Sequence, residues 1–282
     1  MAQLLKGLSA ANALTETLAM RAAALNKKSI TPTLAILRVG ERSDDISYES
    51  GAIKRCAKVG IAVRQFLLSA GCTQAELLSV VRQINEDPSI HGCLMFRPLP
   101  DKTMEEAACS LLSPEKDVDG MTPGSLATVF SGKGAGYPPC TAEGCIALLD
   151  HYNIPLEGKR VTVIGRSLVI GKPVSMMLQA RNATVTMCHT KTVNLPEICR
   201  NAEILVVAAG KAGVVNADFV APGQIVLDVG INVNAEGKLC GDVAFDDVEP
   251  ITEAITPVPG GIGSVTTAVL AKHVIEAAEK TV

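Results

Sequence analysis

The order of hydrophobic and polar positions divides the chain into alternating helices and strands. Residues 8–27 place apolar side chains three and four positions apart, which predicts a long helix. The alternation continues with predicted strands at 34–39, 61–67 and 93–96 and predicted helices at 46–59 and 74–86. Strands that alternate with helices pair in parallel, so this part predicts one α/β unit with a parallel sheet.

The pattern lapses between about 113 and 140, where Pro, Gly, Asp and Ser predominate. This stretch is typical of a linker, and its length and acidic residues also fit a loop that lines a cleft. A second alternation follows, with predicted helices at 141–151, 171–181, 194–201 and 263–280 and predicted strands at 160–165, 183–188, 203–208 and 224–229. The last helix either closes the second unit or crosses back onto the first, and the pattern leaves both arrangements open.

Composition and charge exclude several classes of protein. The chain is 48% hydrophobic and 20% charged, which excludes a disordered chain. Nine cysteines, an odd number without a C-x-x-C pair, argue against a disulfide framework or a zinc knuckle and favour a reducing cytoplasm. A net charge of −3 offers no field for nucleic acid or an anionic membrane, and we find no signal peptide or membrane-spanning run. Aromatic residues are scarce, with no Trp, so any aromatic in a candidate site requires an explanation.

A strand, a glycine turn and a helix start follow one another at 161–173. Gly165 and Gly171 would let backbone N–H groups approach a pyrophosphate at the helix N-terminus. The spacing is neither G-x-G-x-x-G nor that of a phosphate-binding P-loop. The segment predicts a dinucleotide site, and a plain strand–turn–helix connection is the alternative.

The next predicted strand ends in Cys-His-Thr-Lys-Thr at 188–192, without a carboxylate. An NAD-binding domain usually presents Asp or Glu there to the ribose 2′-hydroxyl. The hydroxyl and basic groups of this segment, with Arg166 and Ser167, suit a 2′-phosphate and favour NADP over NAD, although a basic turn is also common on solvated surfaces. The adjacent cysteine and histidine lack a second ligand at metal spacing, so we predict no metal site.

Six segments together resemble the methylenetetrahydrofolate dehydrogenase/cyclohydrolase family. They follow in order over nearly the whole chain, namely Lys116–Gly120 (KDVDG), Pro139–Thr141, the glycine turn from Gly165 to Pro173, Cys188–His189, Asp228–Gly230 and Thr256–Gly261. An isolated Asp-Gly pair such as that in KDVDG indicates only a turn. Its place before the second unit, where α/β enzymes carry substrate groups, favours a functional role.

The resemblance implies an α/β protein with two domains. The first, residues 1–140 completed by the helix at 263–282, would be the catalytic domain, and residues 141–262 would form a Rossmann-type NAD(P)-binding domain with a folate cleft between the two. It also implies a homodimer that oxidises 5,10-methylenetetrahydrofolate to the methenyl form by hydride transfer to NADP, in one-carbon folate metabolism.

Site residues follow from the resemblance position by position. Tyr48 would stack on the folate, Asp119 would hydrogen-bond its pterin, and Pro257, Gly260 and Gly261 would wall the cleft. The candidate catalytic residues are Tyr48, Asp119 and Lys54, and Phe96 is a further candidate for the substrate site. Together with the glycine turn, the candidate cofactor site comprises Gly165, Arg166, Ser167, Gly171, His189, Thr190 and Ile231.

Two positions depart from the family pattern. The family carries Lys one helical turn after the tyrosine, where this chain has Ala52, and Gln where it has Phe96. Lys54 is six residues from Tyr48, about 240° around a helix, and could replace the lysine only through a local distortion or a shifted register. Hydride transfer needs positioning, whereas hydrolysis of the methenyl product needs proton movement. We therefore expect dehydrogenase activity without, or with weak, cyclohydrolase activity.

Three alternatives stand beside this expectation. The protein could be fully bifunctional with Lys54 as the catalytic lysine. It could be a non-catalytic protein that binds folate or nucleotide. It could also be another two-domain dehydrogenase, such as one acting on shikimate, which would leave KDVDG and TPVPGG unexplained.

Overall fold

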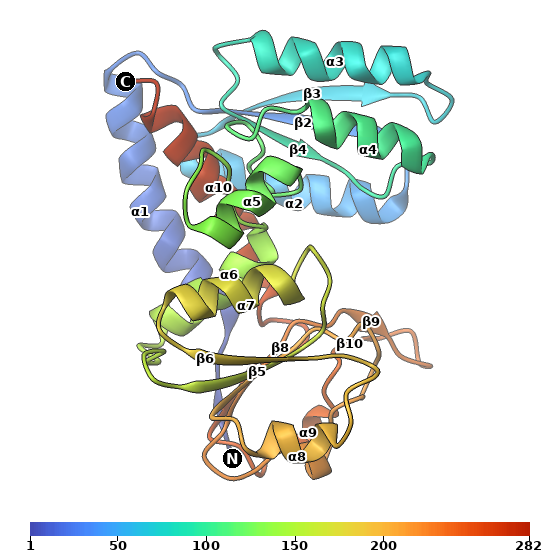
Figure 1. The fold of residues 1–282 in the computed structure, drawn as a ribbon. Helices are drawn as coiled ribbons and strands as arrows, with labels where there is room; N and C mark the ends of the chain where they lie inside the picture. The colour runs from blue at the N-terminus through green and yellow to red at the C-terminus, as the bar shows by residue number, and fades with distance from the viewer. The chain divides into compact units, whose positions relative to one another are not determined.

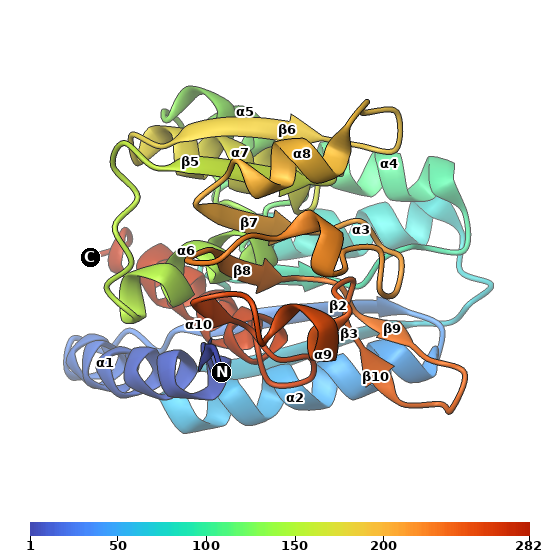
Figure 2. The same cartoon turned by 90° about the horizontal axis from the view of Figure 1, so that it is seen from below.

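The computed structural model describes residues 1–282, which form two compact units (Figures 1 and 2). The three-stranded unit comprises residues 12–140 and 267–282, and the six-stranded unit comprises residues 1–11 and 141–266. The long helices α1 (Gly7–Lys27) and α10 (Gly263–Glu279) each begin in the six-stranded unit and continue in the other. None of the helices combines the length and apolar composition that a bilayer span requires.

The three-stranded unit contains a parallel sheet in the order β3-β2-β4. Its strands are β2 (Thr33–Val39), β3 (Ala62–Leu68) and β4 (Gly92–Met95), and its other helices are α2 (Ser43–Val59), α3 (Gln74–Glu86), α4 (Lys102–Leu111) and α5 (Pro123–Ser131). All seven residues of β2 are buried, as expected for a central parallel strand covered on both faces.

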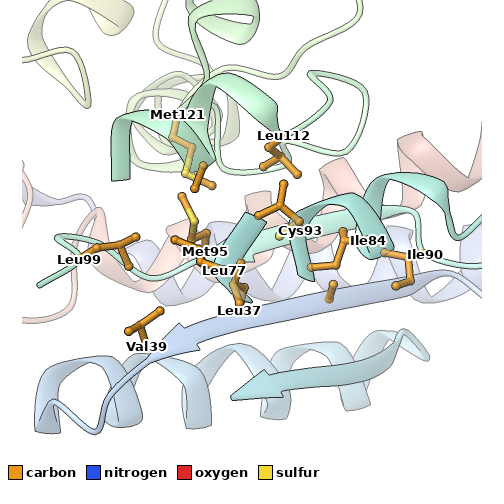
Figure 3. Close-up of a cluster of buried hydrophobic side chains, with 13 residues drawn as sticks. Leu37, Val39, Leu77, Ile84, Ile90, Cys93, Met95, Leu99, Leu112 and Met121 are labelled. Atoms are coloured by element: carbon orange, nitrogen blue, oxygen red, sulfur yellow. The ribbon is translucent and has the colours of Figure 1, made fainter. Parts of the chain in front are cut away.

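The two faces of β2 hold different neighbours because successive side chains of a strand point to opposite sides. Leu37 and Val39 join an apolar cluster with residues of β4, α3 and α4, among them Leu77 and Met95 (Figure 3). Arg38, between them, points to the other face and pairs with a residue of α2. The sheet is thereby fixed to the helix that carries Tyr48.

The six-stranded unit contains a parallel sheet in the order β1-β11-β8-β7-β5-β6. Its strands are β1 (Gln3–Leu4), β5 (Arg160–Ile164), β6 (Thr184–Cys188), β7 (Ile204–Val207), β8 (Ile225–Asp228) and β11 (Ala254–Ile255). From β5 the chain passes first to β6 on one side and then to β7 on the other. Such a reversal of strand order marks the usual ligand position of α/β sheets, at the carboxyl ends of the strands.

Helices cover both faces of this sheet (Figure 1). One face carries α6 (Cys140–His151) and α7 (Gly171–Ala180), and the other carries α8 (Leu195–Arg200), α9 (Phe245–Val248) and the short 3-10 helix Ala217–Phe219. A small hairpin of β9 (Asn232–Val233) and β10 (Leu239–Cys240) follows β8. Layers of helix, parallel sheet and helix define a doubly wound α/β unit.

Every predicted helix and strand forms, with ends displaced by at most three residues. The structure adds α4, α5, α9, the 3-10 helix Ala217–Phe219 and four two-residue strands that the pattern did not predict. It also differs from the expected boundaries, because β1 pairs with β11 and thereby places residues 1–11 in the six-stranded unit. The last helix crosses back, since its residues from 267 onward belong to the three-stranded unit. All nine cysteines are free thiols.

Candidate functional site

Two turns of the six-stranded unit meet at the carboxyl ends of β5 and β6. Ile164 pairs with Cys188 in the parallel ladder, and the N–H of Gly165 donates to the carbonyl oxygen of Cys188 at 2.9 Å. The glycine turn after β5 and the segment 189–192 after β6 are therefore neighbours. These are the two segments from which the sequence predicted cofactor binding.

Both glycines of the first turn are required by close backbone approach. Gly165 has φ +133°, and a Cβ there would lie 2.2 Å from the carbonyl oxygen of Ala208. A Cβ on Gly171 would lie 2.3 Å from the carbonyl oxygen of Gly165. The Ser167 hydroxyl accepts from the N–H of Ile170 at 3.1 Å and closes the turn before α7 begins. The resulting cradle is narrow and lined by backbone, as phosphate binding at a helix N-terminus requires.

Polar and cationic side chains surround this cradle. Arg166, Thr190 and Lys191 are exposed, and the segments 165–172 and 188–194 contain no carboxylate. His189 is half-buried, and its Nδ1 accepts from the N–H of Lys191 at 3.1 Å. The imidazole therefore shapes the second turn, while the cations supply the positive charge that a 2′-phosphate would need.

Two buried aspartates, Asp228 and Asp242, hold the loops after β7 and β8 by hydrogen bonds from backbone N–H groups. Asp242 accepts from the N–H groups of residues 209–211 at 2.6, 2.8 and 2.9 Å. Asp228 accepts from the N–H groups of Gly230, Asp242 and Val243, and burial raises its pKa to about 6. The sequence reasoning missed Asp242, for which an Asp between a glycine and a strand-like run was the only local signal.

A pocket of about 240 Å³ lies beside the loop after β8. It is lined by Asp228–Ile231, Leu239 and residues 257–264, all of the six-stranded unit. The structure thus brings Ile231, predicted for the cofactor, together with Pro257, Gly260 and Gly261, predicted for the folate. The Ile231 side chain is 69% exposed, which leaves it available to a ligand.

In the three-stranded unit, Tyr48 and Phe96 are adjacent. Their ring centroids lie 5.9 Å apart with planes at 81°, an edge-to-face arrangement. Phe96 is buried, whereas Tyr48 is partly exposed. Burial, and then the charge of Asp119, raise the pKa of the Tyr48 hydroxyl well above its ordinary value. The phenol therefore keeps its proton at neutral pH and offers an aromatic surface.

Asp119 lies close to Tyr48, and its neighbour in the motif has a different role. Burial, and then the charge of Asp117, raise the pKa of Asp119 to about 6, while a hydrogen bond from the Cys140 thiol acts in the opposite direction. Asp117 is fully buried and accepts from the N–H groups of Met121 and Thr122 at 3.1 and 2.7 Å. Asp117 thus holds the loop, and Asp119 is the carboxylate left partly exposed for a ligand.

The geometry of α2 shows which of Ala52 and Lys54 lies on the same face of the helix as Tyr48. It is continuous from Ser43 to Val59, and its buried face includes Glu49 and Ala52. Lys54 is exposed, on the opposite side of the helix. Gly51 introduces no break, so the distortion that would bring Lys54 beside Tyr48 does not occur. The position one turn from Tyr48 is occupied by a methyl group.

Sequence reasoning also missed two residues next to Asp119. Cys140 was noted only as part of a motif. The interpretation of His273 as a surface or satisfied core histidine is confirmed in its second form, since the residue is buried and hydrogen-bonded, but its place beside Asp119 was not predicted. The structure places both against the carbonyl oxygen of Val118, at 3.2 Å and 2.7 Å. His273 is 155 residues away from Val118 in the sequence, so no local pattern could have revealed this contact.

The doubly wound sheet and its glycine turn define a two-domain α/β protein with a Rossmann-type NAD(P)-binding unit. Comparison with known proteins gives the family. A family model of the tetrahydrofolate dehydrogenase/cyclohydrolase catalytic domain matches residues 5–119, and the model of the NAD(P)-binding domain of the same family matches residues 139–282. The chain belongs to the tetrahydrofolate dehydrogenase/cyclohydrolase family.

Individual relatives cover the whole chain. The bifunctional protein FolD of Carboxydothermus hydrogenoformans is 50% identical over 99% of this chain and 98% of its own length. The crystal structure of the bifunctional FolD of Campylobacter jejuni matches with a TM-score of 0.95 at 36% identity, covering 100% of both chains. The Trypanosoma brucei FolD, solved with NADP cofactor and an inhibitor, matches with a TM-score of 0.92 at 32% identity, covering 99% of this chain and 98% of that one.

Proposed function

We propose that the protein oxidises 5,10-methylenetetrahydrofolate to 5,10-methenyltetrahydrofolate with NADP as the hydride acceptor, and that it has lost most or all cyclohydrolase activity. The observation that carries the proposal is the site around Tyr48. It keeps an aromatic ring and a partly exposed carboxylate for the folate, yet it has Ala52 and Phe96 where the family pattern has Lys and Gln.

The residues of this chain suit hydride removal. Tyr48 offers a ring face to the pterin, and the ionised Asp119 carboxylate accepts hydrogen bonds from pterin N–H groups. The N–C–N system of the substrate itself carries the cation left by hydride loss, so the step needs positioning and no general base. NADP, when bound, supplies the hydride acceptor. The residues that fit it are Gly165, Arg166, Ser167, Gly171, His189, Thr190 and Ile231.

The same residues suit hydrolysis poorly. Water attack on the methenyl carbon requires a group that takes and returns a proton near neutral pH. The Ala52 methyl group is 0% exposed and Phe96 is 8% exposed, and neither carries a proton to transfer. The Tyr48 hydroxyl keeps its proton because burial raises its pKa. Lys54 is directed to solvent. The product would therefore leave the enzyme as the methenyl form.

The preference for NADP rests on charge. Arg166 and Lys191 are exposed beside the glycine turn, and both neighbouring segments lack a carboxylate that would repel a 2′-phosphate. Arg166→Ala should raise the KM for NADP about tenfold or more and the KM for NAD much less, because a charge-assisted contact to the phosphate is lost. Equal effects on both nucleotides would contradict this assignment. We also propose that the protein is a homodimer and that it is cytoplasmic, and the nine free thiols support the cytoplasmic location.

The decisive experiment measures both activities side by side. Purified protein should reduce NADP with methylenetetrahydrofolate while hydrolysing methenyltetrahydrofolate no faster than buffer. Hydrolysis well above the uncatalysed rate would contradict the loss, and absence of NADP reduction would contradict the dehydrogenase. Lys54→Ala tests the bifunctional alternative, because it should leave both rates unchanged if the lysine is only a surface residue.

A gain-of-function variant tests the reason for the loss. Ala52→Lys with Phe96→Gln restores the two side chains of the family pattern. The double variant should hydrolyse methenyltetrahydrofolate on the order of a hundredfold faster than the parent, the lower end of what general acid–base catalysis contributes. Ala52→Lys alone should gain less, because Phe96 still stands where the family pattern has the Gln that accompanies the lysine.

A further inference from the structure

His273 lies on α10 and is completely buried in the three-stranded unit. Its Nδ1 lies 2.7 Å from the carbonyl oxygen of Val118. Since a carbonyl oxygen only accepts, Nδ1 carries the proton and donates it. That carbonyl belongs to the peptide group that joins Val118 to Asp119. The imidazole therefore fixes the peptide plane from which the Asp119 side chain extends.

Cys140 shares the same acceptor. Its Sγ lies 3.2 Å from the Val118 carbonyl oxygen and 3.7 Å from His273 Nδ1, and its thiol also hydrogen-bonds the Asp119 carboxyl group. A thiol has a single proton and serves one of these acceptors at a time. The Val118 carbonyl oxygen has two lone pairs and can accept from both groups, but the imidazole donation makes it a weaker acceptor for the thiol and so favours the thiol hydrogen bond to the Asp119 carboxylate.

The surroundings hold both the imidazole and the loop in place. The ring of Tyr137 lies 4.9 Å from the imidazole with planes at 32°, and Lys280 donates to the Tyr137 hydroxyl at 2.9 Å. On the far side of Asp119, Gly120 has φ +68°, and a Cβ there would lie 2.4 Å from the backbone of Pro138. The segment around Asp119 therefore leaves little freedom to its carboxylate.

We propose that His273 is a positioning residue for folate binding, which acts through the Val118 carbonyl and the Cys140 thiol to orient the Asp119 carboxylate toward the pterin. The proposal rests on the proposed function, because it assumes that Asp119 binds the pterin. A residue on the last helix, far from the KDVDG motif in the sequence, would thus control how well that motif binds folate.

Removal of the imidazole should also change the protonation of Asp119. Burial and the charge of Asp117 raise its pKa, while the Cys140 thiol, Arg97 and His273 lower it, and the Tyr48 hydroxyl faces it from α2. Without His273, the Val118 carbonyl accepts from the Cys140 thiol alone, which draws the thiol proton away from Asp119, and the electrostatic contribution of His273 that lowers the pKa of Asp119 is lost. Both changes move the pKa of Asp119 upward, so the carboxylate that binds the pterin is protonated at a higher pH.

The experiment compares His273→Leu with His273→Asn, since the Asn amide N–H can take the place of Nδ1. Ile275→Val, a change at another buried position of α10, is the matched control for loss of packing alone. For each variant we would measure kcat, both KM values between about pH 5 and pH 8, folate binding by calorimetry without nucleotide, and Tm.

His273→Leu should raise the KM and the Kd for folate about tenfold and leave the KM for NADP within about twofold. It should shift the acidic limb of the pH profile of kcat/KM to higher pH by about half a pH unit. His273→Asn should recover most of both losses, and Ile275→Val should lower Tm without moving the limb. If His273→Leu does not fold, Cys140→Ala should produce the same upward movement of the limb.

Three results would overturn the proposal. The first is an active His273→Leu variant whose folate affinity and acidic limb of kcat/KM are unchanged. The second is a His273→Asn variant that binds folate no better than His273→Leu. The third is an acidic limb that Ile275→Val moves as far as His273→Leu does. Failure of the proposed function is distinguishable, because the wild-type protein would then show no folate-dependent NADP reduction.

Discussion

The buried ion pair between Arg38 of β2 and Glu49 of α2 should be a major determinant of the stability of the three-stranded unit. Arg38 is 8% exposed and Glu49 is 4% exposed, and Nε donates to Oε2 at 2.8 Å. The other carboxylate oxygen accepts from Gln65 at 2.5 Å, and the guanidinium also donates to the carbonyl oxygen of Gly40. Both carboxylate oxygens of Glu49, and Nε and one terminal nitrogen of the Arg38 guanidinium, therefore have partners inside the protein.

Breaking the pair leaves one charge buried without its counterion. Glu49→Val should lower the free energy of unfolding by about 3–5 kcal/mol, the usual cost of such an uncompensated charge, and Tm by roughly 10 °C. Arg38→Leu should have a similar effect. The double variant removes both charges and fills the space with apolar groups, so it should lie within about 1–2 kcal/mol of the parent.

Urea unfolding followed by far-UV circular dichroism measures these differences, since the chain has no Trp for fluorescence. Lys102→Ala is the control, because the Lys102–Glu106 pair is 88% and 68% exposed and should contribute nothing measurable. A Glu49→Val variant as stable as the parent would refute the argument that the pair is desolvated. A double variant as unstable as the single ones would show that packing, and not the unpaired charge, is responsible.

Three further changes have definite expected outcomes. Gly51→Ala should raise the free energy of unfolding by about 0.5–1 kcal/mol, because the helical Gly51 has nothing within 4 Å of an added Cβ. Gly171→Ala should instead lower Tm and weaken NADP binding, because its Cβ would lie 2.3 Å from the carbonyl oxygen of Gly165. Urea unfolding curves and nucleotide titrations of the two variants test both expectations. Asp242→Ala releases three backbone N–H groups of the loop after β7 and should raise the KM for NADP more than the KM for folate, so equal effects would contradict a local role. His91 accepts from the N–H of Thr33, and burial lowers its pKa below 6.5. Between that lowered pKa and 6.5 the unfolded state binds a proton that the folded state does not, so stability should fall as pH drops below 6.5, and His91→Leu should remove this part of the dependence in urea curves at several pH values.

Much of the fold could be predicted because its signals are local. The helix predicted at 74–86 is α3, which begins with a capping box between Thr73 and Glu76. The unpredicted α4 and α5 also carry local signals, since Asp101 caps α4 and Thr122 with Pro123 begins α5. These capping residues predict both helices, α4 just before the region from 113 to 140 where loop residues predominate and α5 inside it.

The two-residue strands could not be predicted in the same way. A strand as short as Gln3–Leu4 shows no alternation, and it exists because Ala254 and Ile255 lie beside it in the sheet.

The roles of residues in the candidate site also depend on contacts that the sequence does not show. The motif around Asp119 was visible in the sequence, but the role of Asp117 as the loop-holding carboxylate appeared only when its hydrogen-bond partners were known.

The sequence by itself determined the alternating α/β pattern, the glycine turn, the family motifs and the two departures at Ala52 and Phe96, because each is written in residue type and spacing. The tertiary structure decided that α2 is regular and turns Lys54 to solvent. It also decided that His273 reaches Val118. Periodicity fixes which residues share a face of one element, whereas contacts between distant elements depend on how the chain packs.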